Sequence, residues 1–341
     1  MNPQTLEHPQ LLELSAVSRQ EGASLTLDGV NLQLQANKKL AIAGETGSGK
    51  TTLLKIMAGL VAPTAGEVRF EGVRVKGPDE RLIPGQPGIA YLSQQFEFPN
   101  HYRVEEILDF ENRLPQQQAE ELYKVCRIDH LMKRMNGQVS GGERQRIALA
   151  RLLISSPRLL LLDEPFSNLD AIHRSILKSV IRDLGEQLNI TCLLVSHDPL
   201  DTLSWADEVI VLKEGKIVQQ GRPEVIYQQP VDAYVAGLFG VGNFIGPQRA
   251  SVFAALPGME MKDRTAFIRP ENFTLTEESP DAIAGIISGI HFFGSYNDLD
   301  IIVNDGSVIT VRITDAHKKN KNGDAVFVSL TRSIWWLGQS R

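Results

Sequence analysis

The sequence predicts an α/β domain over residues 10–240, followed by a small all-β domain over residues 241–341. Short apolar runs alternate with segments of helical periodicity over residues 38–220, which is typical of helices packed around a largely parallel sheet. One of the apolar runs leads into a glycine-rich turn that opens a helix. Beyond "FGVGNFIGP" (239–247), short alternating runs separated by turn residues replace the helices, and these indicate a second domain.

Composition narrows the class of protein. With 341 residues, 42% hydrophobic and 22% charged, the chain reads as a globular protein of two or three domains. The net charge of −6 argues against nucleic acid as the main partner. No apolar run approaches the roughly 18 residues of a membrane helix, and "MNPQTLEHPQ" lacks the features of a signal peptide. Cys126 and Cys192 form no C-x-x-C pair, which suits a reducing compartment, and we expect a cytoplasmic location.

The first elements in chain order are strands around a turn. In "LTLDGVNLQL" (25–34) the apolar residues recur in a way that predicts antiparallel strands. They are Leu25, Leu27, Val30, Leu32 and Leu34. "KKLAIAG" (38–44) predicts a buried strand, and "TTLLKIMAGL" (51–60) predicts a helix.

The middle of the chain alternates helix and strand. Residues 101–156 look mostly helical, and we place a helical subdomain at about 96–156. "RLLLLDE" (158–164) is the apolar run expected of a strand inside a parallel sheet. A helix is predicted over 171–188, because apolar residues recur every four positions on one face. They are Ile172, Ile176, Val180, Leu184 and Leu188. "ITCLLVSHD" and "DEVIVLKEGKIV" predict further strands.

The C-terminal segment reads as a small β-barrel or sandwich of about 100 residues. Its alternating runs are "TAFIRP", "GIISGIHFF", "DLDIIV", "SVITVRI" and "DAVFVSL". Turn clusters such as "NDGS" and "KNGD" separate them.

The segment "GETGSGKT" (44–51) fits the phosphate-binding pattern G-x-x-x-x-G-K-[ST], with the required strand before it and helix after it. Backbone N–H groups of such a loop wrap phosphates at the helix N-terminus. We expect Lys50 to reach the β- and γ-phosphates and Thr51 to bind Mg²⁺. The nucleotide-binding residues predicted here are Gly44, Glu45, Thr46, Gly47, Ser48, Gly49, Lys50, Thr51 and Thr52.

Two adjacent carboxylates follow the four leucines of the buried strand. Asp163 stands where a second Mg²⁺ ligand is needed, and Glu164 is placed to act as the base on an attacking water. Carboxylates behind a buried strand are costly unless a cation or a catalytic task engages them. A guanine-reading N-K-x-D segment is missing, which argues against a small GTPase.

The stretch "VSGGERQR" (139–146) combines a helix cap with an unusual first turn. Ser140 and Glu143 form the S-x-x-E pattern of a capping box. Gly141 and Gly142 then each cost the helix about 1 kcal/mol relative to alanine. A cap does not need these glycines, so we expect another group to approach this helix end closely.

These motifs together resemble those of ATP-binding-cassette (ABC) ATPases. "GETGSGKT", "YLSQQ", "VSGGERQR", "LLLLDEP", "SNLD" and "VSHD" occur in that family's order, and 90 residues separate Lys50 from Ser140. The resemblance implies a P-loop NTPase cassette with a RecA-like core, an antiparallel β subdomain and a helical subdomain. "FIRPENF" (267–273) resembles the OB-like TOBE barrel that ends importer ATPases for sugars, sulfate, polyamines or ferric iron.

The resemblance assigns roles residue by residue. Gln94 matches the Q-loop glutamine, a catalytic and Mg²⁺-binding residue of the family. The adjacent Gln95 is the alternative match to that glutamine. Asp170 resembles the residue that links the two sites of a dimer, and His197 resembles the switch histidine on the γ-phosphate. The signature residues Ser140, Gly141 and Gly142 would cap the nucleotide held by a second copy.

One departure from the family pattern concerns adenine. Members usually carry an aromatic residue upstream of the P-loop, yet no Phe, Tyr or Trp precedes Phe70. Arg19 lies roughly where the aromatic residue belongs. Its guanidinium could stack on the adenine ring, or it could be a solvated loop charge, and both interpretations stay open.

The implied function is that of the ATPase subunit of an ABC importer. Its cofactors would be ATP and Mg²⁺, and it would pair head to tail with a second copy of itself. Transmembrane permease subunits and, indirectly, an extracytoplasmic solute-binding protein would be its partners, with the chain peripheral on the inner face of the membrane. The alternatives are an exporter ATPase or a soluble non-transport ABC ATPase, with the barrel as a regulatory binding module.

Overall fold

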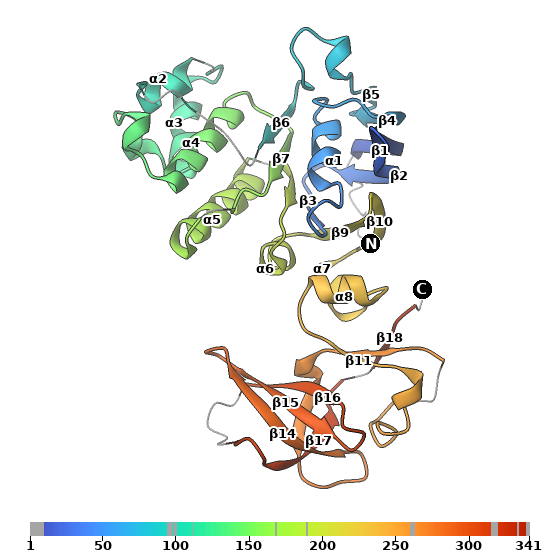
Figure 1. Ribbon diagram of the computed structural model, residues 1–341. Helices are drawn as coiled ribbons and strands as arrows, with labels where there is room; N and C mark the ends of the chain where they lie inside the picture. Colours follow the sequence, from blue (N-terminus) through green and yellow to red (C-terminus); the bar gives the residue numbers. More distant parts are fainter. Residues whose placement is uncertain are drawn as a thin grey trace, which may run out of the picture. The chain divides into compact units, whose positions relative to one another are not determined.

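The computed structural model describes residues 10–93, 98, 101–110, 112–167, 169–188, 190–259, 263–314, 320–332 and 334–338. These residues form two compact units, of which unit 1 ends at Pro223 and unit 2 begins at Glu224 (Figure 1). The boundary expected after residue 240 therefore falls inside unit 2. No helix in the described part of the chain has the length and apolar character needed to cross a bilayer.

Unit 1 is built around a six-stranded sheet in the order β10-β9-β3-β8-β7-β6. Its strands are β3 (Lys39–Ala43), β6 (Ile89–Leu92), β7 (Leu159–Asp163), β8 (Thr191–Val195), β9 (Glu208–Lys213) and β10 (Lys216–Gly221). The strands from β9 to β6 run parallel, whereas β10 returns antiparallel to β9. Because β7 and β8 are buried along their whole length, the predicted parallel sheet is confirmed.

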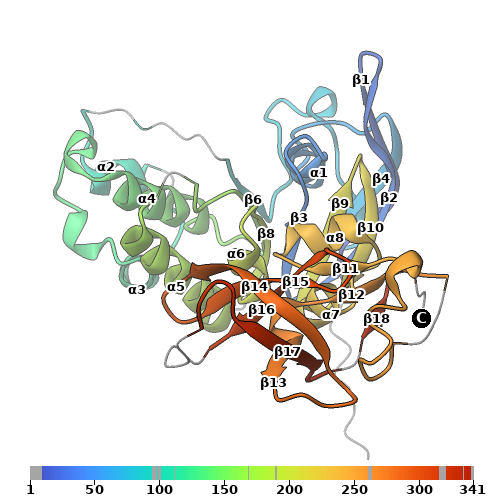
Figure 2. The same cartoon turned by 60° about the horizontal axis from the view of Figure 1, so that its bottom comes forward.

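A second, antiparallel sheet has the order β2-β1-β4-β5. Its strands are β1 (Gln10–Glu21), β2 (Ser24–Gln35), β4 (Ala65–Phe70) and β5 (Val73–Arg74). β1 and β2 form the long hairpin visible in Figure 2. The apolar residues predicted to face the core here are buried except Leu25, which is 49% exposed near the hairpin tip.

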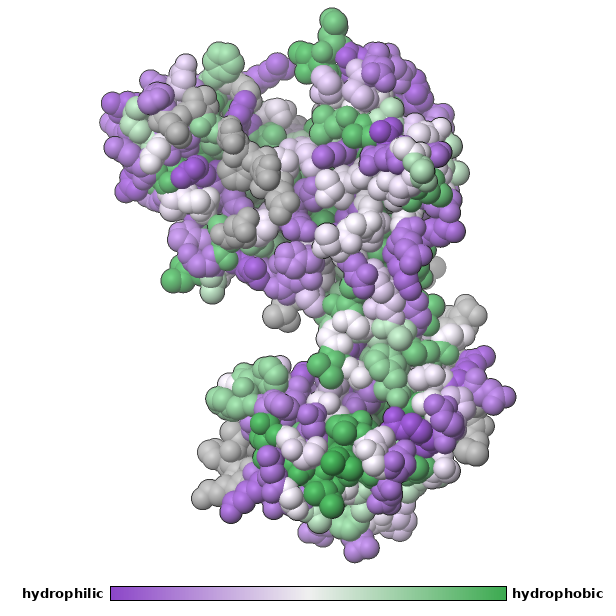
Figure 3. Space-filling model, viewed as in Figure 1, coloured by the Kyte–Doolittle hydropathy of each residue, from purple (hydrophilic) through white to green (hydrophobic). Residues whose placement is uncertain are grey.

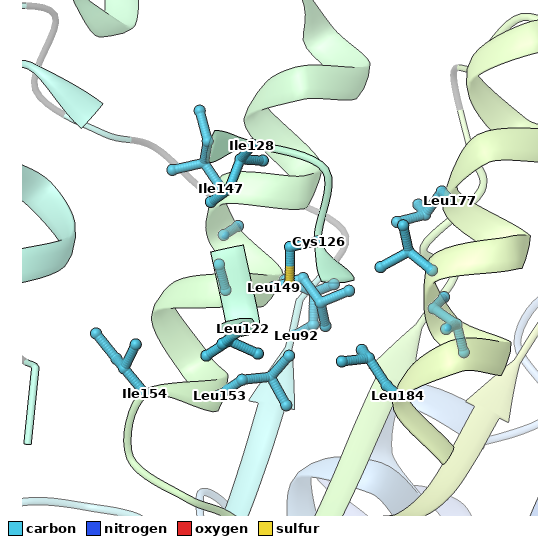
Figure 4. Close-up of a cluster of buried hydrophobic side chains, with 14 of the residues drawn as sticks. Leu92, Leu122, Cys126, Ile128, Ile147, Leu149, Leu153, Ile154, Leu177 and Leu184 are labelled. Carbon is cyan, nitrogen blue, oxygen red and sulfur yellow. The ribbon is translucent and has the colours of Figure 1, made fainter. Parts of the chain in front are cut away.

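Helices cover the two faces of the central sheet. Leu159 and Leu161 of β7 pack with α1 (Lys50–Met57) and the antiparallel sheet, while Leu160 and Leu162 pack with the helices of the other face. This alternation follows from the two-residue period of a strand. The helices of the second face are α2 (Val104–Asp109), α3 (Gln116–Val125), α4 (Gly141–Leu153) and α5 (Ala171–Gln187). Figure 4 shows their core around Cys126.

The buried face of α5 differs from the predicted one. Ile172 is 73% exposed and Leu188 is 42% exposed, so both predictions were wrong. A spacing of four drifts around a helix of 3.6 residues per turn, and a long run of i, i+4 positions therefore leaves the core face. The buried stripe comprises Leu177, Val180, Ile181 and Leu184.

Unit 2 contains antiparallel sheets in the orders β13-β17-β14-β15-β16 and β11-β12-β18. The strands are β11 (Asn243–Ile245), β12 (Ala266–Ile268), β13 (Phe273–Thr276), β14 (Ile283–Phe292), β15 (Asn297–Val303), β16 (Val308–Ile313), β17 (Ala325–Leu330) and β18 (Trp335–Trp336). The Asn243 side chain exchanges two hydrogen bonds with the Thr310 backbone and so ties the sheets together. The predicted all-β fold is confirmed for the part of unit 2 that follows its two helices, where the strands begin at Asn243, and hydrophobic residues gather on one face of unit 2 in Figure 3.

Arg269 joins two helices to the strands of unit 2. These helices are α7 (Pro223–Gln228) and α8 (Ala233–Leu238). The Arg269 side chain is 1% exposed and donates hydrogen bonds to backbone carbonyls in and after both helices. Those carbonyls belong to Tyr227, Ala236, Gly240 and Val241. Burial lowers the pKa of Arg269, and the four carbonyls compensate part of the desolvation.

Candidate active site

The glycine-rich loop joins β3 to α1. Gly49 at the N-cap of α1 has φ of 102°, and a Cβ there would lie 2.7 Å from the Thr26 carbonyl oxygen. Only glycine combines this conformation with this close approach. Residues 45–47 are exposed at the tip, whereas Ser48 and Lys50 are buried. The tip of the loop is therefore open to solvent, while its base is packed.

The Lys50 side chain lies across the base of the loop. Its Nζ donates to the carbonyl oxygens of Gly44 at 2.8 Å and Glu45 at 2.7 Å. Burial lowers the pKa of Lys50, while the charges of Glu164 and Asp163 act in the opposite direction. The ammonium group thus binds the loop and lies within electrostatic range of Asp163 and Glu164, at the C-terminal end of β7.

Asp163 ends β7 and is 3% exposed. Its Oδ1 accepts a hydrogen bond from Thr51 Oγ1 at 3.1 Å, and its Oδ2 accepts one from the Tyr91 hydroxyl at 2.8 Å. The hydroxyl of Thr51 and the carboxylate of Asp163 are hard oxygen donors of the kind that small divalent cations prefer. The expected metal-binding pair is therefore in contact.

Tyr91 is a site residue that the sequence analysis missed. Burial raises the pKa of Tyr91, and the neighbouring Asp163 raises it further, so the phenol remains a neutral donor. The signal lay in "GIAYLS", where a tyrosine interrupts an otherwise apolar strand. Its partner Asp163 could not be predicted from the sequence, because the two residues meet only through the pairing of β6 with β7.

Glu164 has an unusual backbone conformation. Its φ is 48°, in the left-handed region that non-glycine residues rarely adopt. The Glu164 N–H donates to the Val195 carbonyl, and the Ser167 N–H donates to the Glu164 carbonyl. The Glu164 carboxylate lies 3.4 Å from His197 Nδ1, with side-chain exposures of 24% and 62%. The strained backbone of Glu164 thus coincides with a carboxylate that lies next to His197.

The helix cap predicted at Ser140 is present. Ser140 Oγ accepts from the Glu143 N–H at 3.2 Å, and the Glu143 carboxylate accepts from the Ser140 N–H at 2.7 Å. The two glycines that follow have different surroundings. A Cβ on Gly141 would meet nothing within 4 Å, whereas one on Gly142 would lie 2.6 Å from Cδ2 of His173. Packing within the chain accounts for Gly142, and Gly141 is the glycine that faces open space.

The signature helix and the phosphate loop lie on opposite faces of the central sheet. Helix α1 packs in the core cluster of the antiparallel sheet, and α4 packs in the other cluster. Figures 1 and 2 both place α4 across β6 and β7 from α1. One copy of the chain therefore does not bring Ser140 to its own Lys50.

Two further predicted residues, Asp170 and His197, lie at or near the first turns of helix α5. Asp170 caps its N-terminus, with Oδ1 accepting from the His173 N–H at 2.9 Å. Arg174 of the same helix donates to Asp198, the residue after His197, at 2.7 Å. Gln94 and its alternative Gln95 lie outside the described residues.

Arg19 lies in β1 rather than in a loop. Its Nη1 donates to the Ala62 carbonyl at 2.9 Å, and its side chain is 29% exposed. The interpretation as a solvated loop charge was therefore wrong. The stacking role toward adenine stays a prediction.

Comparison with known proteins agrees with this arrangement. The ABC transporter family matches residues 27–167, and the TOBE domain family matches residues 266–337. The sulfate/thiosulfate import ATP-binding protein CysA of Synechocystis sp. is 32% identical over 331 residues, covering 92% of each chain. The glucose import ATP-binding protein GlcV of Saccharolobus solfataricus is 35% identical over 273 residues, covering 76% of this chain and 77% of its own.

Solved structures agree on the fold. The ADP conformation of MJ1267, an ATP-binding cassette of an ABC transporter, superposes with a TM-score of 0.58 and 21% identity, over 68% of this chain and 98% of its own. CbiO1 of Clostridium perfringens, part of the ABC transporter complex cbiONQ, has a TM-score of 0.57 and 24% identity, over 64% and 90%. At such identity the likeness concerns the fold alone. The sequence relatives decide the family, and the chain belongs to the ABC transporter family, with a TOBE domain after its ATP-binding cassette.

Proposed function

We propose that this chain is the ATP-hydrolysing subunit of an ABC importer and that it drives a separate transmembrane permease. The observation that supports this most directly is the meeting of Lys50, Asp163, Glu164 and His197 at one edge of the sheet. A phosphate chain on the loop would have a cation on one side and a base on the other. The import direction comes from the two relatives described above, which are a sulfate/thiosulfate import ATP-binding protein and a glucose import ATP-binding protein.

The hydrolytic step assigns one task to each of three groups. A water oxygen attacks the γ-phosphorus while the bond to the ADP oxygen breaks, and the Glu164 carboxylate takes the proton of the water. His197 lies next to that carboxylate and would contact the γ-phosphate. Lys50 offsets the charge that builds on the phosphate oxygens.

Mg²⁺ is the proposed metal partner of ATP. Thr51 and Asp163 would hold it, together with Gln94 or Gln95, and it would neutralise charge on the β- and γ-phosphates. The contact between Thr51 and Asp163 supports this placement, because it brings together a hydroxyl and a carboxylate oxygen, both of which could bind the same divalent cation.

The active form that we propose is a head-to-tail homodimer. Ser140 Oγ accepts one hydrogen bond in its cap and keeps its own proton for donation. With Gly141 open beside it, this helix end can receive the phosphate bound by a partner copy. The separation of α4 from α1 within one copy supports the composite site. The dimer would sit on permease subunits at the inner face of the membrane, with an extracytoplasmic solute-binding protein as an indirect partner.

A Glu164→Gln variant tests the hydrolytic role. It should bind ATP but lose about 10²–10⁴-fold in turnover, because the amide cannot accept the proton. The same variant should run as an ATP-dependent dimer on size exclusion. Glu214→Gln is the matched control, since Glu214 also has a positive φ, of 47°, but is exposed at the β9–β10 turn. Turnover near the wild-type level in Glu164→Gln would contradict the assignment.

A further inference from the structure

His173 contacts two of the predicted site residues, Asp170 at the start of its own helix and Gly142 in the first turn of α4. Its ring Nδ1 is 2.7 Å from Oδ2 of Asp170, and its backbone N–H donates to Oδ1 of the same carboxylate at 2.9 Å. A carboxylate only accepts hydrogen bonds, so Nδ1 carries the proton of this contact. Both oxygens of Asp170 are therefore held by one residue.

The Cβ, Cγ and Cδ2 atoms of His173 pack on the signature helix. A Cβ built on Gly142 would lie 2.6 Å from Cδ2 and 2.8 Å from Cγ of His173. A side chain at position 142 would thus displace the ring from its place beside Asp170. The ring fills the space between the first turn of α4 and the first turn of α5.

The electrostatics of Asp170 agree with this contact. The backbone N–H of His173, followed by its ring, holds the pKa of the Asp170 carboxyl below its usual value. The Asp170 side chain is itself 63% exposed, so it is held in place by these hydrogen bonds and not by burial. Without the ring proton, one carboxylate oxygen would be free to turn toward solvent.

We infer that His173 is a positioning residue that orients the Asp170 carboxylate. Because its ring also contacts Gly142, the orientation of this carboxylate depends on the position of the signature helix α4. This inference rests on the proposed function and its head-to-tail dimer, for which the family resemblance implies that Asp170 links the two nucleotide sites. When α4 shifts against α5, the ring in contact with Gly142 moves, and the hydrogen-bonded carboxylate follows. A simple helix cap would need only the backbone N–H of His173, and the ring contact adds orientation to that cap.

Two variants of similar shape distinguish the effect of the hydrogen-bond donor of His173 from the effect of its packing against Gly142. In His173→Asn the amide nitrogen takes the place of Nδ1 and can still donate to Asp170. In His173→Leu a methyl group takes that place, and the contact with Gly142 is kept. ATP turnover of the full chain is measured for both variants, together with KM for ATP and the thermal midpoint.

His173→Leu should lower kcat about tenfold, as expected for a lost hydrogen bond to a charged group, with KM within about twofold. His173→Asn should return kcat to within about threefold of wild type. An Asp170→Asn background provides a second comparison, because a residue that acts through Asp170 should have no further effect there. This cycle also shows whether a loss in His173→Leu is merely a folding defect, which would persist in that background.

Each outcome decides one question. If His173→Leu and His173→Asn both hydrolyse ATP at the wild-type rate, the proposed role of His173 is overturned, while the proposed function stays intact. Equal impairment of the Leu and Asn variants would also overturn it, because the donor would then be irrelevant. A wild-type chain that hydrolyses no ATP would contradict the proposed function itself.

Discussion

At the residue scale, Asp163 is held by two hydroxyl groups from different elements. Thr51 reaches Oδ1 from the first turn of α1, and Tyr91 reaches Oδ2 from the neighbouring strand β6. A buried carboxylate is costly unless such donors satisfy it. The two donors therefore fix the carboxylate in the orientation that the proposed metal site requires.

Removal of the Tyr91 hydroxyl should destabilise unit 1. We expect Tyr91→Phe to lower the free energy of unfolding by about 1.5–3 kcal/mol, the usual range for a hydrogen bond to a charged group. Urea unfolding of the two proteins measures the difference. Tyr123→Phe is the matched control, because the buried Tyr123 hydroxyl has no hydrogen-bond partner within the described part of the chain. This control should be neutral or stabilising, and an equal loss in both variants would refute the role of Tyr91.

Because of two buried thiols, we expect the free energy of unfolding to fall at alkaline pH. Burial raises the pKa of both Cys126 and Cys192 from a usual value of 9.0 to about 12. Above pH 9 the thiols of the unfolded chain lose protons while those of the folded chain keep them, so unfolding becomes more favourable. Each thiol should lower the free energy of unfolding by about 1.4 kcal/mol per pH unit in this window.

The measurement is urea unfolding of unit 1 between pH 8 and pH 10. A Cys126→Ala variant should start from a lower stability, since a buried side chain is shortened, but its pH slope should be smaller by the share of one thiol. A slope that is unchanged in this variant would mean that the thiol already ionises in the folded chain. Thiol reagents should accordingly react with the native protein only after unfolding.

At the element scale, the first turn of α4 contains two glycines with opposite surroundings. Gly141 faces open space, whereas Gly142 contacts His173. The same substitution at the two positions therefore tests two different properties. One property is access to the helix end, and the other is packing between α4 and α5.

We expect Gly141→Ala to leave the fold intact and to raise stability by about 0.4–1 kcal/mol, because alanine restricts the unfolded chain. Its ATP turnover should nevertheless fall, since the new methyl group stands where the phosphate of the partner copy would approach. Gly142→Ala should lower stability, because its methyl group overlaps the His173 ring. Thermal unfolding and ATPase rates measure both effects. Full turnover in Gly141→Ala would argue against a phosphate at this helix end.

At the scale of the whole molecule, the boundary between the units decides where the chain can be divided. Every described residue of the proposed site precedes Pro223, and the carbonyl groups satisfied by Arg269 all follow it. A break after residue 242 would separate Arg269 from the two helices that it holds. A break after residue 223 leaves this network within one unit.

A chain ending at residue 223 should therefore hydrolyse ATP and remain monodisperse. A chain ending at residue 242 should retain the site but aggregate, because the carbonyls near α7 and α8 lose the buried donor. Size exclusion and ATPase assays of both chains check this prediction. Complete loss of turnover in a folded 1–223 chain would indicate that unit 2 helps to build the active dimer.

The sequence by itself determined the features that depend on neighbouring residues. The phosphate loop, the capping box at Ser140, the strand before Asp163 and the alternating strands of unit 2 each follow from short patterns. The motif order was sufficient to identify the ABC transporter family, and the relatives confirm it. These features were predictable because, in each of them, the residues that form the sequence pattern are also the residues that determine the local structure.

Only the tertiary structure decided which distant residues meet. Tyr91 and Asp163 are 72 positions apart in sequence and come together through the pairing of β6 with β7. No local sequence pattern pointed to His173, whose ring lies against Gly142 only because α4 and α5 pack together. Arg269 likewise joins α7 and α8 to the strands of unit 2 by hydrogen bonds that no local pattern records. Strand register and helix packing set such contacts, and both are fixed by the buried core as a whole rather than by any single segment.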